Sequence, residues 1–123
     1  MTSSTVARNL ASGSGVGAGI YQRGSGSLVI YSSILWANGN GGVGPDMGIQ
    51  LEAGTLEMSY SNSQDVKPGD GNISLDPAFQ NVSAGDLRLL TVSACIDAGD
   101  PALTDADGST SDIGAHGGPG GAW

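Results

Sequence analysis

The sequence predicts an all-β fold built from a short coil of parallel strands, and three observations support this prediction. The 123 residues include 22 glycines, whereas aromatic residues make up only 5% and charged residues only 13%. Average glycine usage is about 7%. No window shows sustained apolar residues at helical spacing. Short β-type stretches recur along the chain, and each is broken by Gly, Asn or Pro.

Three segments form an internal repeat, which we align at Asn9, Ser33 and Ser61. The intervals are 33 − 9 = 24 and 61 − 33 = 28 residues. One turn of a coil of parallel strands takes about two dozen residues, and each turn buries its inward side chains only by stacking on the next. Such coils need about three or more turns for stability, which is close to what this chain supplies.

The predicted strands are short and lie between turns. The first three stretches are GAGIY (17–21), SLVIYSSILW (27–36) and GIQLEAGTLEMSYS (48–61). Further on, DLRLLTVSACI (86–96) shows alternation and is also expected to be extended. The stretch GSGVGAG (13–19) precedes a strand pattern and not a helix, which favours a glycine-rich turn over a phosphate-binding loop.

The charge of the chain is strongly negative, at −8 from twelve acidic and four basic residues. Nucleic-acid binding needs clustered Lys and Arg, and the basic residues here are scattered singly, so we expect no nucleic-acid partner. An acidic surface fits solubility outside the cell or binding of divalent cations. The sequence shows no signal peptide and no apolar run long enough to predict a membrane span.

The single cysteine, Cys95, makes an internal disulfide impossible. Its apolar neighbours favour a buried, inert thiol over a reactive one. His116 is the only histidine, and zinc needs three or four ligands, so we expect His116 to be an ordinary loop residue.

Five aspartates follow in one short stretch: Asp97, Asp100, Asp105, Asp107 and Asp112. They are candidate ligands for Ca²⁺, which takes about 6–8 oxygen ligands and tolerates irregular loops. The spacing is not that of an EF-hand, since no Glu closes the loop. Alternatively, these carboxylates hold turns by accepting hydrogen bonds from nearby backbone N–H groups. The sequence leaves both interpretations open.

Within IDAGD (96–100), each residue has a structural interpretation. Ile96 is expected to point inward, Asp97 to bond backbone amides and Gly99 to adopt a positive φ that other residues resist. These features would fix the last turn of the chain.

Four aromatic residues are candidates for stacking on sugar rings: Tyr21, Tyr31, Trp36 and Tyr60. Aromatic residues on successive turns of a coil also stack on one another as part of the structure. Both interpretations remain open from the sequence.

Five stretches resemble motifs of bacterial right-handed parallel β-helix proteins of the pectate-lyase-like superfamily, in particular the C-terminal coils of choice-of-anchor Q domain proteins. In chain order they are ASGSGVGAGIY (11–21), VIYSSILWANGN (29–40), GDGNISLDPAF (69–79), GDLRLLTVSACIDAGD (85–100) and DADGSTSDIGAHGG (105–118). The resemblance runs from about Asn9 to Gly118, and Ala94 replaces the family's usual proline. It covers only the last coils and the cap of proteins that are normally longer.

The resemblance implies a single domain, a short right-handed parallel β-helix of about three to four coils with an irregular C-terminal cap. We expect the coils in residues 1–90 and a final strand with an Asp/Gly-rich capping loop in residues 91–123. The family's earlier coils are missing, so the first coil should expose apolar side chains and unpaired strand edges. The chain is then either a fragment or hides that end by self-association.

For function, the resemblance implies a non-enzymatic module of a secreted or surface protein, located outside the cell, that presents a polar acidic face to carbohydrate or protein. The alternative is a fragment of a polysaccharide lyase or glycoside hydrolase acting on acidic polysaccharide with Ca²⁺. Hydrolysis needs two carboxyl groups about 5–10 Å apart, and elimination needs a base. Because the sequence offers clustered acid without base, we expect no catalytic residues.

Overall fold

A computed structural model describes residues 1–11, 18–39 and 48–121 and confirms the all-β class. The described residues form nine short strands and one short 3-10 helix, Val82–Ala84. The strands are β1 (Thr5–Ala7), β2 (Ile20–Gln22), β3 (Ser27–Tyr31), β4 (Ile34–Trp36), β5 (Ile49–Leu51), β6 (Thr55–Ser59), β7 (Asn62–Ser63), β8 (Phe79–Asn81) and β9 (Asp86–Leu89). Most of the predicted turn over 13–19 lies outside the described residues.

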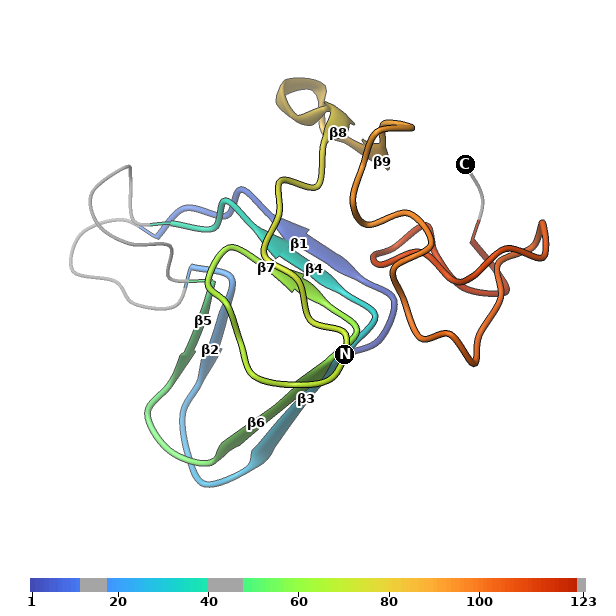
Figure 1. The fold of residues 1–123 in the computed structure, drawn as a ribbon. Helices are drawn as coiled ribbons and strands as arrows, with labels where there is room; N and C mark the ends of the chain where they lie inside the picture. Colours follow the sequence, from blue (N-terminus) through green and yellow to red (C-terminus); the bar gives the residue numbers. More distant parts are fainter. Residues whose placement is uncertain (12–17, 40–47, 122–123) are drawn as a thin grey trace.

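The first seven strands pair in parallel with strands far along the chain. β2, β3 and β4 pair with β5, β6 and β7 respectively, and β1 pairs with β4 on its other edge. We call residues 18–39 the first layer and residues 48–63 the second layer. Figure 1 looks along the stack, where the β2–β5, β3–β6 and β1–β4–β7 sheets lie along three sides of a triangle.

Two partial layers flank the two complete ones. Residues 1–11, which we call the leading half-layer, bond to residues 29–39 of the first layer. At one end of this contact the Met1 amino group donates to the Val29 carbonyl at 2.7 Å. On the other side, residues 64–75, the trailing half-layer, bond to the second layer, for example through a bridge between Ile73 and Asn62. The side of the triangle formed by the β1–β4–β7 sheet is therefore the most completely paired.

A ladder of small polar side chains links equivalent positions of successive layers. The Ser4 N–H donates to Ser33 Oγ at 3.2 Å, and the Ser33 N–H donates to Ser61 Oγ at 3.1 Å. The predicted 28-residue interval between Ser33 and Ser61 is confirmed. The alignment of Asn9 with Ser33 is wrong, because Asn9 bonds to Asn38 instead, its N–H donating to Oδ1 at 3.1 Å. Small polar residues follow two bends both in the leading half-layer and in the first layer, and the sequence pattern did not distinguish these two bends.

The corner before each ladder serine is made by a residue with left-handed backbone. Ser3, Ser32 and Tyr60 have φ values of 41°, 46° and 48°. This conformation costs a non-glycine residue roughly 1 kcal/mol or more, so the surrounding bonds must hold it. The same position of each layer carries the same bend, which keeps the strands that follow in register.

Two apolar clusters stabilise the fold. The first lies inside the triangle around Ile30, Leu35 and Met58. The second lies between the outer face of the β1–β4–β7 sheet and the C-terminal half of the chain; its buried members are Ile34, Phe79, Leu89, Cys95 and Ile113. Because neighbouring residues of a strand point to opposite faces, Ile34 and Leu35 of β4 contribute to different clusters.

The C-terminal half packs against the side of the stack. β8 and β9 form an antiparallel hairpin, and the described residues beyond it are irregular apart from a Thr104–Thr110 bridge. The Gly114 N–H donates to the Ser32 carbonyl at 3.0 Å, which places this segment beside the first layer. Figure 1 shows the segment alongside the β1–β4–β7 sheet.

The predicted strand over 86–96 is confirmed for residues 86–89 and wrong for residues 90–96, so the predicted final strand after residue 91 is absent from the described residues. β9 ends at Leu89, and the following residues form turns. The Ser93 hydroxyl accepts from the Cys95 N–H at 3.1 Å and donates to the Pro77 carbonyl at 2.6 Å. These local bonds satisfy backbone groups that a strand ladder would otherwise pair.

Within the described part of the chain, none of the helices has the length and apolar character needed to cross a bilayer.

Candidate functional site

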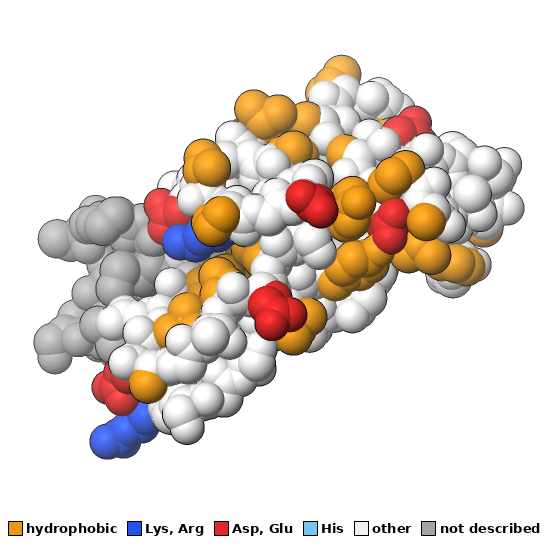
Figure 2. Space-filling view, turned by 60° about the horizontal axis from the view of Figure 1, so that its bottom comes forward, with side chains coloured by type: hydrophobic (Ala, Val, Ile, Leu, Met, Phe, Trp, Pro, Cys, Tyr) orange, Lys and Arg blue, Asp and Glu red, His pale blue; other side chains and the backbone are white. Residues whose placement is uncertain are grey.

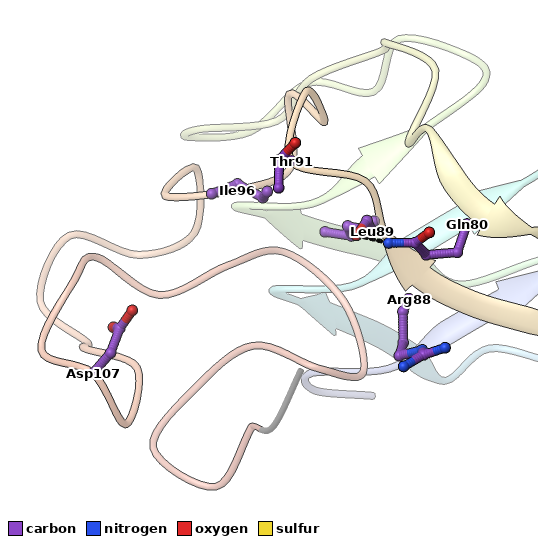
Figure 3. A pocket seen from close by; sticks show the side chains of 6 residues that line it. All are labelled: Gln80, Arg88, Leu89, Thr91, Ile96 and Asp107. Carbon is purple, nitrogen blue, oxygen red and sulfur yellow. Dashed lines mark hydrogen bonds between the residues drawn. The ribbon is translucent and has the colours of Figure 1, made fainter.

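A cleft of about 340 Å³ lies between the β8–β9 hairpin and the C-terminal segment. Figure 3 shows the lining side chains, with Gln80 and Arg88 on the hairpin and Asp107 on the C-terminal loop. The complete lining is Gln80, Arg88, Leu89, Thr91, Ile96 and Asp107. The hairpin is held closed by Asn81, whose Oδ1 accepts from the Ala84 N–H at 3.2 Å.

Arg88 is fixed on the hairpin side by Asp86. Its Nε and Nη2 groups donate to the two carboxylate oxygens at 2.9 and 2.6 Å. This bidentate pair lowers the pKa of Asp86 to about 2 and raises the pKa of Arg88. A guanidinium group carries five N–H donors, so this pair leaves three of them for other partners.

Asp107 lies on the opposite side of the cleft. Its Oδ1 accepts from the Ser109 hydroxyl at 2.7 Å and from the Ser109 N–H at 2.9 Å, and these bonds lower the pKa of Asp107. Leu89 and Ile96 add apolar side chains to the lining. The cleft therefore offers hydrogen-bond donors on one side and a carboxylate on the other.

The predicted aspartates are spread along the C-terminal segment as acceptors of backbone hydrogen bonds. Asp100 accepts from the Ala102 N–H at 2.8 Å, and Asp112 accepts from the Asp97 N–H at 2.7 Å. Asp105 accepts from the Asp112 N–H at 3.0 Å. With the Asp107 bonds, four of the five aspartates accept backbone hydrogen bonds. Local turn capping is confirmed for Asp100 and Asp107, whereas the donors to Asp105 and Asp112 lie 7 and 15 residues away in the chain.

No three His, Cys, Asp or Glu side chains among the described residues are grouped so that they could hold a metal ion. Four of the aspartates are already oriented by backbone donors. Calcium binding by Asp97, Asp100, Asp105, Asp107 and Asp112 therefore stays a prediction.

The interpretation of IDAGD is partly wrong. The positive φ of 54° is at Asp97, which is exposed, and Gly99 is not among the positive-φ residues. Gly99 is required for close approach, because a Cβ there would lie 2.5 Å from the Ser111 carbonyl oxygen. Asp97 adopts the bend because its N–H is bound by the buried carboxylate of Asp112. Ile96 is half-buried and packs against the second apolar cluster.

The four predicted aromatic residues do not form one platform. Tyr21 lies on β2, where its hydroxyl donates to Glu52, and Trp36 is half-buried against the second cluster. Tyr31 and Tyr60 are in contact edge to face, with ring centroids 5.8 Å apart. This pair favours the structural interpretation, since stacked neighbours stabilise adjoining layers.

Tyr31 also connects the first layer to the C-terminal segment. Its hydroxyl donates to the carboxylate of Asp100. This hydrogen bond raises the pKa of Tyr31 to about 12 and lowers the pKa of Asp100.

A tyrosine titration followed by ultraviolet absorbance tests this connection. We expect Tyr31 to ionise at about pH 12, and the Tyr31→Phe variant to lose this last step while Tyr21→Phe keeps it. An unfolded tyrosine ionises near pH 10, so the stabilisation is complete below pH 10 and is lost as pH rises through about 12. An unchanged last step in Tyr31→Phe would contradict the contact.

Cys95 is buried as predicted, with no exposed surface, and burial raises the pKa of its thiol. His116 is half-buried in a turn of the C-terminal segment. Sequence reasoning missed Gln80, Arg88 and Thr91 as site residues. The available signal was the Asp86-x-Arg88 spacing, which puts opposite charges on one face of a strand.

Figure 2 shows a few charged side chains spread over one face of the molecule, the basic ones beside acidic ones, with apolar side chains elsewhere on the face. The three ion pairs of the described residues are each local or join neighbouring layers: Arg23–Glu52, Lys67–Asp65 and Arg88–Asp86. On this face the acidic residues do not gather into one continuous patch.

No family model matches this chain, and neither the curated proteins nor the solved structures contain a significant match.

Proposed function

We propose that this chain is a short right-handed parallel β-helix that serves as a non-enzymatic carbohydrate-binding module outside the cell. The parallel pairing of two layers at intervals of 28–29 residues supports the β-helix, as do the serine ladder and the recurring corners. Parallel crossover connections are right-handed in nearly all proteins, which supports the handedness. The extracellular location rests on the quoted sequence motifs.

The cleft is the observation that carries the binding proposal. A sugar ring has hydroxyl groups around its rim and an apolar C–H face. Possible donors from Arg88, Gln80 and Thr91 share the lining with the Asp107 carboxylate and with the apolar side chains of Leu89 and Ile96. Sites for small ligands commonly combine apolar surface with a few placed polar groups.

One observation favours the enzymatic alternative, and the pKa shifts of the same residues oppose it. The cleft brings Arg88 and Asp107 together, so an acidic and a basic side chain do share a concave surface. However, Asp86 raises the pKa of Arg88, and bonds from Ser109 lower the pKa of Asp107. As a general base, Arg88 would have to lose its proton at working pH, and its raised pKa opposes this. As a general acid, Asp107 would have to hold a proton, and its lowered pKa opposes that.

Binding is tested by heteronuclear NMR titration with neutral and uronic oligosaccharides. We expect shifts at the amides of Thr91, Ile96 and Asp107, with at least about tenfold weaker binding in Asp107→Asn and Thr91→Val. Asp65→Asn, which lies outside the cleft lining, is the matched control and should bind normally. Unchanged affinity in both cleft variants would move the site elsewhere, and absence of binding to every sugar would remove the proposal.

The same sugars separate the enzymatic alternative. Incubation with polygalacturonate and alginate, with and without Ca²⁺, should release no unsaturated product absorbing in the ultraviolet. Release of such a product, abolished in Asp107→Asn, would favour a lyase over a binding module.

A further inference from the structure

The second layer is only partly covered on the side that faces away from the first layer. Residues 64–75 cover its β7 side, where the Ser63 N–H donates to the Ile73 carbonyl at 3.2 Å. The chain then continues into the hairpin and the C-terminal segment, which lie alongside the β1–β4–β7 sheet (Figure 1). Within the described residues, β5 pairs only with β2 and β6 pairs only with β3. We call the uncovered stretch, residues 49–56, the open edge.

The backbone of β6 presents hydrogen-bonding groups along the open edge. The Thr55 N–H donates to the Gly26 carbonyl at 3.2 Å, and the Ser59 carbonyl accepts from the Ser32 N–H at 3.3 Å, so Thr55 and Ser59 face the first layer. In a parallel pair alternate residues face opposite edges, so the N–H and C=O of Leu56 point away from the first layer. The Leu56 backbone is therefore oriented to pair with a further strand.

A side chain takes the place of a neighbouring strand just beyond the open edge. Met58 faces the same way as Leu56, and its carbonyl accepts from Asn72 Nδ2 at 2.8 Å. The Oδ1 of the same amide accepts from the Ser61 N–H at 3.1 Å. The chain thus satisfies the end of β6 with its own amide group, and pairing with an added strand would begin at Leu56.

The open edge also exposes part of the apolar cluster inside the triangle, which we call the inner cluster. Leu35 of this cluster has no exposed surface, because its strand β4 lies between β1 and β7. Ile49 and Leu56 belong to the same cluster but are only half-buried. A strand added along the open edge would remove this apolar surface from water, which is favourable.

The charge around the open edge indicates the chemistry of the occupant. Residues 48–76 contain five acidic residues and one lysine, which gives a net charge of 1 − 5 = −4. The lysine, Lys67, is already paired with Asp65 at 3.7 Å. Glu57 is exposed, and it alternates with Leu56 and therefore points to the outer face of β6. Two copies joined at this edge would bring like charges together, whereas a basic segment would be attracted.

We propose that the open edge binds an extended, basic segment of another protein, which adds a strand beside β6. Strand addition to an exposed sheet edge is a recurring mode of peptide recognition, in which backbone bonds give affinity and alternate side chains give specificity. The added strand exchanges backbone hydrogen bonds with Leu56. A Lys or Arg side chain lies beside Glu57 on the outer face, and an apolar side chain lies beside Leu56 on the inner face.

A synthetic peptide of alternating valine and lysine is the probe, and NMR titration with hydrogen exchange is the measurement. We expect the bound peptide to protect the Leu56 amide. The Glu57 amide faces the first layer and should be protected with or without the peptide. A peptide of the same sequence that is N-methylated at every residue keeps the charges but lacks backbone donors, and it should not bind. A peptide of alternating valine and glutamate should not bind either.

One pair of protein variants tests the role of charge. Glu57→Gln should weaken binding of the valine–lysine peptide about threefold, as expected for the loss of one cross-strand ion pair. Asp97→Asn removes an exposed carboxylate from the C-terminal segment and is the matched control, which should bind normally. Equal affinities of the wild type and Glu57→Gln would overturn the charge pairing.

Three other results would overturn the proposal. One is absence of binding by the valine–lysine peptide, and another is equal binding by its N-methylated form. The third is a bound peptide that leaves the Leu56 amide unprotected. Protection of the Leu56 amide that grows with protein concentration, without any peptide, would assign the open edge to a second copy and would also contradict the proposal.

Discussion

Replacing Asn62 by leucine is expected to lower the free energy of unfolding by about 3 kcal/mol. Asn62 has no exposed surface, and its Nδ2 group donates to the Leu75 carbonyl at 2.7 Å and to Cys95 Sγ at 3.0 Å. Its Oδ1 accepts from the Leu75 N–H at 3.2 Å. Leucine fills a similar volume but leaves both backbone groups of Leu75 without their partners, each at a cost of about 1–3 kcal/mol.

Urea unfolding followed by circular dichroism measures this effect. Asn81→Ala is the comparison, because Asn81 is exposed and caps a short 3-10 helix through one hydrogen bond. That change should cost about 1 kcal/mol. Equal losses in the two variants would show that the Asn62 amide does not hold the trailing half-layer.

Replacing Gly114 by alanine is expected to cost about 3 kcal/mol by two separable effects. Its φ of 113° is a conformation that side chains resist. A Cβ would also lie 2.7 Å from Ile34 Cδ1 and 3.1 Å from Thr5 Oγ1, both on the β1–β4–β7 sheet. The added methyl group would therefore push the C-terminal segment away from the sheet.

Gly108→Ala is the matched control for backbone strain. Gly108 has a φ of 89°, and a Cβ there would meet no atom within 4 Å. Its loss should be limited to the conformational part, about 1–2 kcal/mol. The difference between the two variants in thermal or urea unfolding measures the contact with the sheet. If both variants lose the same stability, the segment does not lie against Ile34.

The layered arrangement was predictable because stacked strands place equivalent side chains above one another. The Ser33–Ser61 interval appears directly in the sequence, and the structure confirms it as a hydrogen bond. The earlier interval was misaligned, because both Ser4 and Asn9 are small polar residues that follow a bend. Only the register of β1 with β4 distinguishes the two corners.

The position of the C-terminal segment was not predictable in the same way. It depends on contacts between residues far apart in sequence, such as Ile34 and Ile113 in the second apolar cluster. An alternating pattern also marks residues 86–96, but the Ser93 hydroxyl bonds end the strand early. Local competition for backbone groups overrides periodicity there.

The candidate site was also predictable only in its local contacts. Turn capping by Asp100 and Asp107 was foreseeable, because an aspartate side chain commonly bonds the backbone two residues on. The cleft was not, since it brings Arg88 and Asp107 together from separate segments. The positive φ in IDAGD was assigned to the wrong residue: Asp97 adopts it, whereas Gly99 is needed because a side chain there would collide with the Ser111 backbone.

The stacking of the two layers is tested most directly by nuclear Overhauser contacts between methyl groups of the inner cluster. The structure pairs Ile20 with Ile49 and Leu28 with Leu56 as direct neighbours in parallel strands. We therefore expect strong contacts within both pairs, together with parallel cross-strand contacts between their backbones. Antiparallel contacts between β2 and β3, with none between residues 28–29 positions apart, would contradict the layered fold.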